Sequence, residues 1–282
     1  QVRMRQRVLD FINFSGKKET FKAGAIKLML AGIIVRLMGF ANRIFMSNLI
    51  GAEGMGLFQL TSPVYSLIIL TLTSGVSISV SGMAAAEAAR GSSANARRIA
   101  KTAFLLLLGV GMAAGLALVV FARGISVAVL HDERTYLSMV LLAPCIPIVA
   151  SASAIKGYFY GISNVTPNAF SQIVEQIVRI GVIFLLAEHI AGQNLAYACA
   201  LATVSAAVGE MANLCVVGFV FLRLDRKERN SCATVSRLAA AKEISKASWP
   251  VSLSRFLTSL MGMVEAIILP MRFVAGGYSY KA

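Results

Sequence analysis

Apolar residues fill long stretches of this chain, and polar residues gather in the short segments between those stretches. A helix needs about 20 mostly apolar residues to cross the hydrocarbon core of a membrane. Seven stretches approach or exceed that length, which predicts seven membrane-spanning helices and no β-strand. We expect the helices at residues 24–49, 57–84, 102–122, 137–160, 168–187, 195–222 and 247–274.

Glycine and proline residues indicate where these helices end or bend. The sequence GAEGMG at 51–56 predicts a short turn between the first two helices. Pro144 and Pro147 lie inside the fourth stretch, where proline removes a backbone hydrogen bond, so we expect a kink there. Gly109, Gly111 and Gly115 of the third helix are expected to permit close helix packing.

The composition agrees with a membrane protein. The chain of 282 residues is 57% hydrophobic and only 14% charged, with a mean hydropathy of +0.73. These values exclude a soluble globular domain and favour an all-α polytopic membrane protein. The net charge of +14 does not indicate nucleic-acid binding, because the basic residues lie between apolar spans and form no basic surface with interleaved aromatic residues.

The distribution of charge predicts domains and orientation. Most of the 27 Lys and Arg residues lie in alternate connections between the predicted helices. The positive-inside rule places such segments in the cytoplasm, so we expect a cytoplasmic N-terminus in a multi-pass protein of the plasma membrane. The expected parts are a basic tail (1–23), a six-helix lobe (24–222), a basic cytoplasmic linker (223–246) and a seventh helix (247–282).

The first helix carries two arginines within its apolar stretch. Arg36 is expected near the bilayer centre, where charge disfavours insertion by about 2.5–3.5 kcal/mol unless it faces protein, water or an anion. Arg43 follows about two helical turns later and shares its face. We interpret this face as one wall of a cationic cavity. Arg36 would contact a ligand or an acidic residue of another helix, whereas Arg43 could instead extend to the membrane surface.

A second polar stripe runs along the fifth predicted helix. Gln172, Glu175, Gln176 and Arg179 occur at i, i+3, i+4 and i+7, so they share one face of an otherwise apolar helix. Such a stripe is expected to face a cavity or polar neighbours rather than lipid. Glu175 and Arg179 could form a purely structural ion pair. Alternatively, they line a cavity in which the carboxylate tunes the arginine for exchange of an anion or a proton.

The seventh predicted helix repeats this pattern, with Arg255 and Glu265 on one broad face. A guanidinium suits phosphate because its planar fork of donors stays charged. The available partners for the arginines of the first helix are a ligand's phosphate, Glu175, Glu210 and Glu265. The candidate substrate-binding residues are Arg36, Arg43, Glu175, Arg179, Arg255 and Glu265.

Motifs for catalysis or metal binding are missing from the sequence. The four cysteines have no metal-ligand spacing, and the two histidines lie outside any metal-binding or nucleophile motif. We therefore expect no catalytic residue, no metal and no cofactor, and we do not expect an enzyme.

Two segments resemble a known transporter superfamily. Residues 24–91 resemble the start of the multidrug/oligosaccharidyl-lipid/polysaccharide (MOP) flippases, which include the MATE-like transporters. The second segment, GYFYGISNVTPNAFSQIVEQIVRI at 157–180, is similar to the fourth loop and fifth helix of polysaccharide-biosynthesis proteins similar to stage V sporulation protein B. In the first segment the likeness rests on Arg36, Gly39, Arg43, IGAEGMGLFQL (50–60), Pro63, Tyr65 and Gly75.

The resemblance implies a V-shaped transporter of two six-helix lobes around a central cavity. Such a protein flips an undecaprenyl-pyrophosphate-linked oligosaccharide or cell-wall precursor across the bacterial cytoplasmic membrane by alternating access. Arg36 and Arg43 would contact the pyrophosphate. The implied partners are membrane lipid, the lipid-linked sugar and a coupling cation. Members of this branch often have a lysine near the end of the second helix, where this chain has Ser81 and Gly82, so no site is inferred there.

Three other functions stay open. A cation-coupled multidrug exporter of the same superfamily would need an acidic, aromatic-lined cavity, which Arg36 and Arg43 disfavour. A membrane-embedded glycosyl or acyl transferase would need a catalytic set of His or Asp residues near a membrane face. Seven helices amount to one lobe and the first helix of a second. We therefore expect a chain truncated after the seventh helix, and a non-transporting remnant is the third alternative.

Overall fold

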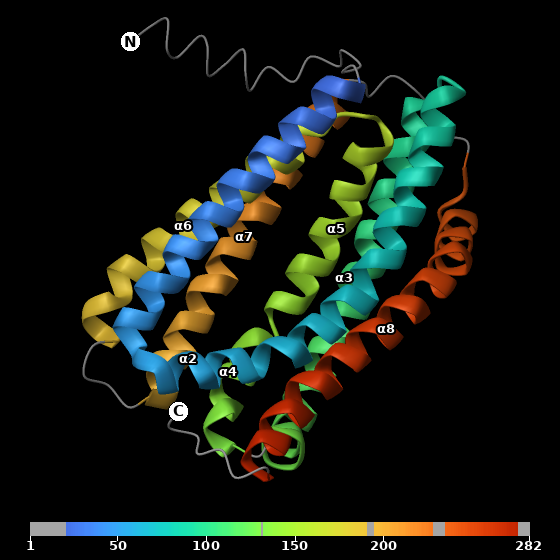
Figure 1. Ribbon diagram of the computed structural model, residues 1–282. Coiled ribbons are helices and arrows are strands. Elements are labelled where there is room, and N and C mark those ends of the chain that lie inside the picture. Colours follow the sequence, from blue (N-terminus) through green and yellow to red (C-terminus); the bar gives the residue numbers. More distant parts are fainter. Residues whose placement is uncertain (1–20, 131, 191–194, 228–234, 276–282) are drawn as a thin grey trace, which may run out of the picture.

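The computed structural model describes residues 21–130, 132–190, 195–227 and 235–275 (Figure 1). Within these ranges every element is helical, which confirms the all-α fold class. The predicted tail up to residue 20 lies outside them. The elements are α2 (Phe21–Ala89), α3 (Ser93–Gly124), the π-helical turn η1 (Ile125–Val129), the 3₁₀ turn η2 (Glu133–Thr135), α4 (Tyr136–Leu142), α5 (Cys145–Gly161), α6 (Thr166–Ile190), α7 (Leu195–Lys227) and α8 (Arg237–Ala275).

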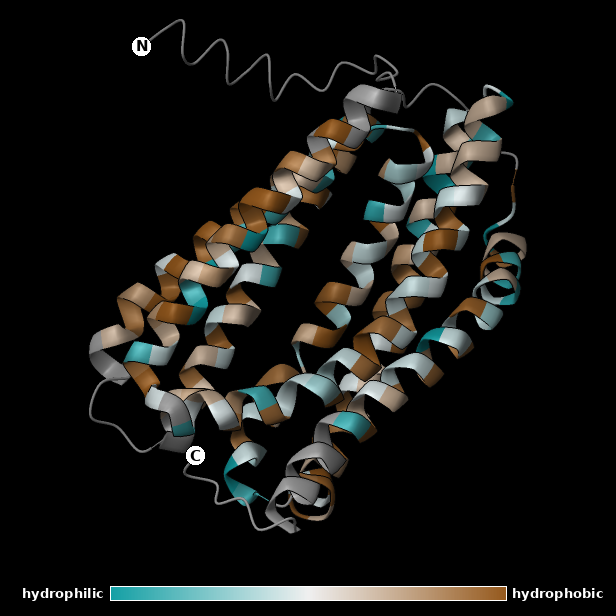
Figure 2. Ribbon diagram, viewed as in Figure 1, coloured by the Kyte–Doolittle hydropathy of each residue, from teal (hydrophilic) through white to brown (hydrophobic). Residues whose placement is uncertain are grey.

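Most of these helices are long and apolar enough to cross a membrane. Hydrophobic residues cover most of the length of α6 and of the first half of α2 (Figure 2). Five helices in the described ranges meet the requirement, or six if the bent pair α4–α5 is one span. The described part of α8 is not among them, so a seventh span stays a prediction. The five are Leu28–Gly51, Glu53–Ala89, Ser93–Val129, Thr166–Ala187 and Ala198–Asp225.

Helix α2 consists of two helices that meet at Gly51. This residue has φ 71° and ψ −179°, a backbone conformation that essentially only glycine adopts. The prediction of a turn over 51–56 is therefore wrong in extent, because the second helix already begins at Glu53. The early start buries Met55 and Leu57 in a core with Met46 and Ile50.

Two predicted basic connections are also shorter than expected, because the helices continue past the apolar stretch. The segment 86–101 is helical except around Arg90–Ser92, and Glu87 there accepts hydrogen bonds from Arg90 and Asn95 at 2.9 Å each. At the other connection α7 runs to Lys227. Residues 228–234 of the predicted linker lie outside the described residues, and α8 begins at Arg237, ten residues earlier than expected.

The kink predicted from two prolines is confirmed. Helices α4 and α5 bend by 41° between Leu142 and Cys145, beside Pro144. Helix α6 agrees with the predicted fifth helix to within three residues at either end.

The two halves of α2 diverge from Gly51, each beside a different set of helices (Figure 1). The first half lies beside α6 and α7, and the second half packs with α3, α5 and α8. Glycines allow the closest approaches in the second set. A Cβ at Gly157 or Gly161 of α5 would come within 2.7 Å of a backbone oxygen of α2.

A Cβ at Gly111 would meet Pro147 of α5, and one at Gly115 would meet the carbonyl oxygen of Ala143, between α4 and α5. The expected close packing is confirmed for these two glycines. It is wrong for Gly109, where a Cβ would meet no heavy atom within 4 Å.

Candidate functional site

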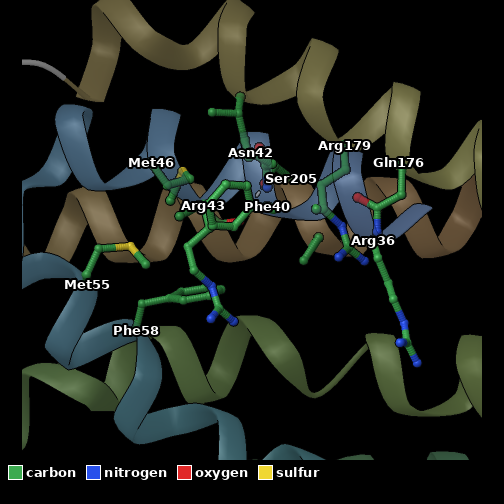
Figure 3. Close-up of a pocket in the computed structure, with 14 residues that line it drawn as sticks. Arg36, Phe40, Asn42, Arg43, Met46, Met55, Phe58, Gln176, Arg179 and Ser205 are labelled. Atoms are coloured by element: carbon green, nitrogen blue, oxygen red, sulfur yellow. Dashed lines mark hydrogen bonds between the residues drawn. The ribbon is translucent and has the colours of Figure 1, made fainter. Parts of the chain in front are cut away.

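Arg36 and Arg43 project from the same side of the first half of α2, as their spacing predicted (Figure 3). Both residues are exposed in the structure. Gly39 lies between them, and a Cβ there would meet no heavy atom within 4 Å. Among the described residues, neither arginine has an ion-pair or hydrogen-bond partner. The two guanidinium groups therefore have free donors facing open space.

A pocket of about 400 Å³ lies beside these arginines. This volume falls within the range of about 300–1,000 Å³ that is usual for small-ligand sites. Both halves of α2 contribute to its walls, together with α6 and α7 (Figure 3). The polar lining residues are Arg36, Asn42, Arg43, Gln176, Arg179 and Ser205. The apolar lining includes Phe40, Met46, Met55, Phe58 and Ile183.

Arg179 belongs to both the pocket and a network of carboxylates behind it. Its Nη2 donates to Oε1 of Glu175 at 2.8 Å and lies 3.6 Å from Oε1 of Glu210 on α7. Asn213, also on α7, donates its Nδ2 to the other oxygen of Glu175. The side chains of the ion-paired residues are largely buried, with exposures of 23%, 13% and 18% for Arg179, Glu175 and Glu210. One arginine thus faces two carboxylates.

Gly209 explains how this network is assembled between α6 and α7. A Cβ at Gly209 would lie 3.2 Å from the carbonyl oxygen of Glu175 and 3.3 Å from Cβ of Arg179. Because glycine leaves that space free, the two helices approach closely. This approach places Glu210, the next residue, beside the arginine.

Three residues of the pocket carry a buried polar atom that has no hydrogen-bond partner within the described part of the chain. These atoms are Oδ1 of Asn42, Oε1 of Gln176 and Nε of Arg179. An unpaired buried polar group costs about 1–3 kcal/mol, so such atoms are uncommon in native proteins. All three atoms are fully buried, so they lie behind the pocket surface rather than on it.

The structure brings Arg36, Arg43 and Arg179 to one pocket, with Glu175 directly behind Arg179. The structural ion pair considered for Glu175 and Arg179 is therefore present, and Arg179 still reaches the cavity. The other two predicted residues, Arg255 and Glu265, are exposed on α8 and do not line this pocket.

Sequence reasoning missed two features of the site. Asn42 lies beside Arg43 in an apolar stretch, and this isolated amide is a signal that could have found it. Glu210 was considered as a partner for the arginines of α2, but the structure pairs it with Arg179. Glu210 and Asn213 lie three residues apart and share one face of α7, a spacing that could have found them. Which helix that face meets could not be read from spacing. Among the described residues, no group of three or more His, Cys, Asp or Glu side chains could hold a metal.

Comparisons with known proteins agree on one family of membrane proteins. Residues 21–276 match the family model described as polysaccharide biosynthesis protein. The chain is 28% identical over 275 residues to stage V sporulation protein B of Bacillus subtilis (strain 168). This alignment covers 94% of this chain and 52% of that protein. The chain is 30% identical over 213 residues to lipid II flippase MurJ of the same organism, covering 69% and 38%. The chain therefore spans about half the length, or less, of these relatives.

Solved structures show the same fold at low identity. An outward-facing multidrug resistance MATE family transporter of the MOP superfamily matches with a TM-score of 0.68 at 18% identity, covering 86% of this chain and 55% of that one. A MOP superfamily transporter from Pyrococcus furiosus, described as having a binding pocket of reverse polarity, matches with a TM-score of 0.66 at 18% identity, covering 86% and 54%. The fold is thus that of MATE-like transporters, and the chain is a multi-pass membrane protein.

Proposed function

Since this chain belongs to the polysaccharide biosynthesis protein family of the MOP superfamily, we propose that it forms the substrate-binding part of a flippase for a lipid-linked pyrophosphate sugar. The flippase works by alternating access, and the undecaprenyl tail of its substrate stays in the bilayer. The observation that carries the proposal is the pocket beside α2, in which Arg36 and Arg43 have no partner among the residues that the structure describes.

The balance of charge at the pocket favours an anion. Three guanidinium groups face it or lie in it, and the two carboxylates nearby, Glu175 and Glu210, both lie against Arg179. The charges of Arg36 and Arg43 are therefore left without a counter-ion among the described residues. A pyrophosphate offers one phosphate to each of them, and each phosphate can accept the two parallel hydrogen bonds of a guanidinium fork.

The same balance disfavours a cationic drug. A positively charged ligand in this pocket would lie beside two arginines that have no counter-ion in the described part of the chain, and like charges repel each other. A coupling cation would instead act through Glu175 and Glu210, which are the carboxylates beside the pocket. Binding of such a cation is part of the proposal.

The proposed setting is the bacterial cytoplasmic membrane with the N-terminus in the cytoplasm. The support for this orientation is the basic composition of the segments that flank Glu87 and Asp225, which the positive-inside rule assigns to the cytoplasmic side. Lys101 and Asp225 form an ion pair at 2.7 Å at that end of the helices.

Binding of undecaprenyl pyrophosphate to the purified full chain in lipid nanodiscs tests the proposal. We expect Arg36→Ala and Arg43→Ala each to weaken binding about tenfold or more, since a hydrogen bond to a charged group contributes about 1.5–3 kcal/mol. Arg36→Lys keeps the charge but loses the fork, so an intermediate loss is expected. Arg123→Ala, an exposed arginine on α3 outside the pocket, is the matched control.

Two outcomes would contradict the proposal. Unchanged affinity in the variants of Arg36 and Arg43, with folding intact, would remove the anion site. Binding of a cationic dye in place of the pyrophosphate lipid would favour the multidrug exporter. Arg255→Ala distinguishes the pocket beside α2 from the face of α8. If the lipid binds in the pocket, this variant keeps wild-type affinity. If Arg255 binds the lipid, as the sequence predicted, the variant loses affinity.

A further inference from the structure

The first turns of α8 have two opposite faces. Ala240, Ile244 and Ser248 are buried and form the face that packs against the rest of the bundle. The hydroxyl oxygens of Ser248 and Ser79 of α2 lie 3.1 Å apart, within hydrogen-bond distance. A Cβ at Gly75 of α2 would come within 2.5 Å of the carbonyl oxygen of Ser248. This tight packing fixes which residues of α8 point away from the bundle.

The opposite face of α8 carries a stripe of exposed residues. The stripe runs through Lys242, Lys246, Trp249, Leu253 and Leu260. Intervals of three, four and seven residues place all five side chains on one face of a helix. Neither lysine has a hydrogen bond or an ion pair with any residue that the structure describes. Helix α8 lies at one edge of the molecule (Figure 1), so the stripe is open to a partner.

The side chains along this stripe follow the order of the layers in one leaflet of a bilayer. At 1.5 Å per residue, Lys242 and Lys246 lie about 6 Å apart along the helix axis, and one headgroup region is about 5–8 Å thick. Trp249, which is 70% exposed, follows one turn later, and tryptophan concentrates at the boundary between headgroups and hydrocarbon. The exposed leucines come after it. This order matches a lipid leaflet.

The two lysines determine which lipid fits best. An ammonium group has three donors and no acceptor, so it suits a phosphate that carries no cation of its own. Glu243 is also exposed, but its position directs it to the flank of the stripe. We propose that Lys242, Lys246 and Trp249 form a binding site for the headgroup of an anionic phospholipid. None of the three lines the pocket beside α2. In the orientation proposed above, the lipid belongs to the cytoplasmic leaflet, whose negative surface attracts lysine.

Fluorescence of Trp249 tests this site directly, because the chain contains a single tryptophan. The full chain is placed in nanodiscs of phosphatidylcholine that contain an equal fraction of either brominated phosphatidylglycerol or brominated phosphatidylcholine. Bromine quenches tryptophan only at close range, so the quenching measures how often each lipid lies beside Trp249. We expect phosphatidylglycerol to quench more strongly, with a preference of up to about fivefold for each lysine.

Variants of the two lysines connect this preference to the stripe. Lys242→Gln and Lys246→Gln should each reduce the preference by up to about fivefold, and the double variant should be quenched equally by both lipids. Lys246→Arg keeps the charge and should keep the preference. Added salt should weaken the preference of the wild type, because exposed charges are screened. Arg123→Gln, which changes an exposed arginine of α3 outside the stripe, is the matched control and should keep the full preference.

Three results would overturn the proposal. Equal quenching of the wild type by both lipids would show that the site does not select an anionic headgroup. A preference that survives in the double variant would place the responsible cations elsewhere. Absence of quenching by either lipid would show that protein, such as a second copy of the chain, covers Trp249. Since these nanodiscs contain no pyrophosphate lipid, each result is independent of the proposed flippase function.

Discussion

The close approach of α5 to the second half of α2 predicts a large effect for one added methyl group. A Cβ at Gly157 would lie 2.7 Å from the carbonyl oxygen of Ser77 and 3.2 Å from its Cα. Both are backbone atoms of α2 and cannot rotate away, so Gly157→Ala must push the helices apart. Overpacking of this kind costs about 1–3 kcal/mol, and the gain in helix propensity offsets at most about 1 kcal/mol. We expect a net destabilisation of about 1–2 kcal/mol.

Gly82→Ala on α2 is the matched control, since its Cβ would meet no heavy atom within 4 Å. It should leave stability unchanged or raise it by up to about 1 kcal/mol through helix propensity. Reversible unfolding by sodium dodecyl sulfate in mixed micelles measures both variants. Equal stability of Gly157→Ala and Gly82→Ala would show that α5 and α2 do not pack as closely as described here.

Three further changes test other parts of the structure. Gly51→Ala should destabilise the chain by about 1–3 kcal/mol in the same unfolding assay, because φ 71° with ψ −179° strains any residue that has a Cβ. Arg179→Met leaves two largely buried glutamates without their ion-paired arginine, and we expect a loss of about 3 kcal/mol that neutralising one glutamate partly restores. Burial raises the pKa of Asp132, but hydrogen bonds from Arg134 and its charge outweigh this and hold the pKa below its usual value. The stability that Asp132 contributes is thus present at neutral pH and lost as the pH falls through that lowered pKa, and Asp132→Asn should remove this loss from a plot of melting temperature against pH.

The features that sequence predicted well are those set within one helix. The shared face of Arg36 and Arg43 and the ion pair of Glu175 with Arg179 follow from helical periodicity alone. The kink beside Pro144 follows from the missing backbone donor. Local chemistry determines each of them.

Contacts between helices could not be predicted in this way. The pairing of Arg179 with Glu210 depends on the approach of α6 to α7 at Gly209, which no spacing within either helix encodes. The ends of α3 and α8 were misplaced for a related reason. Their charged first segments read as loops. In α3, however, Arg97 and Lys101 pair with Asp225 of α7, and in α8 Ala240 and Ile244 are buried in the core.

A crystal structure of the chain with bound undecaprenyl pyrophosphate would test the central claim most directly. We expect the pyrophosphate between the guanidinium groups of Arg36 and Arg43, with nitrogen-to-oxygen distances of about 2.7–2.9 Å and the undecaprenyl tail directed toward lipid. A pyrophosphate bound elsewhere, for example at Arg255 on α8, with the pocket beside α2 left without it, would contradict the assignment of the site.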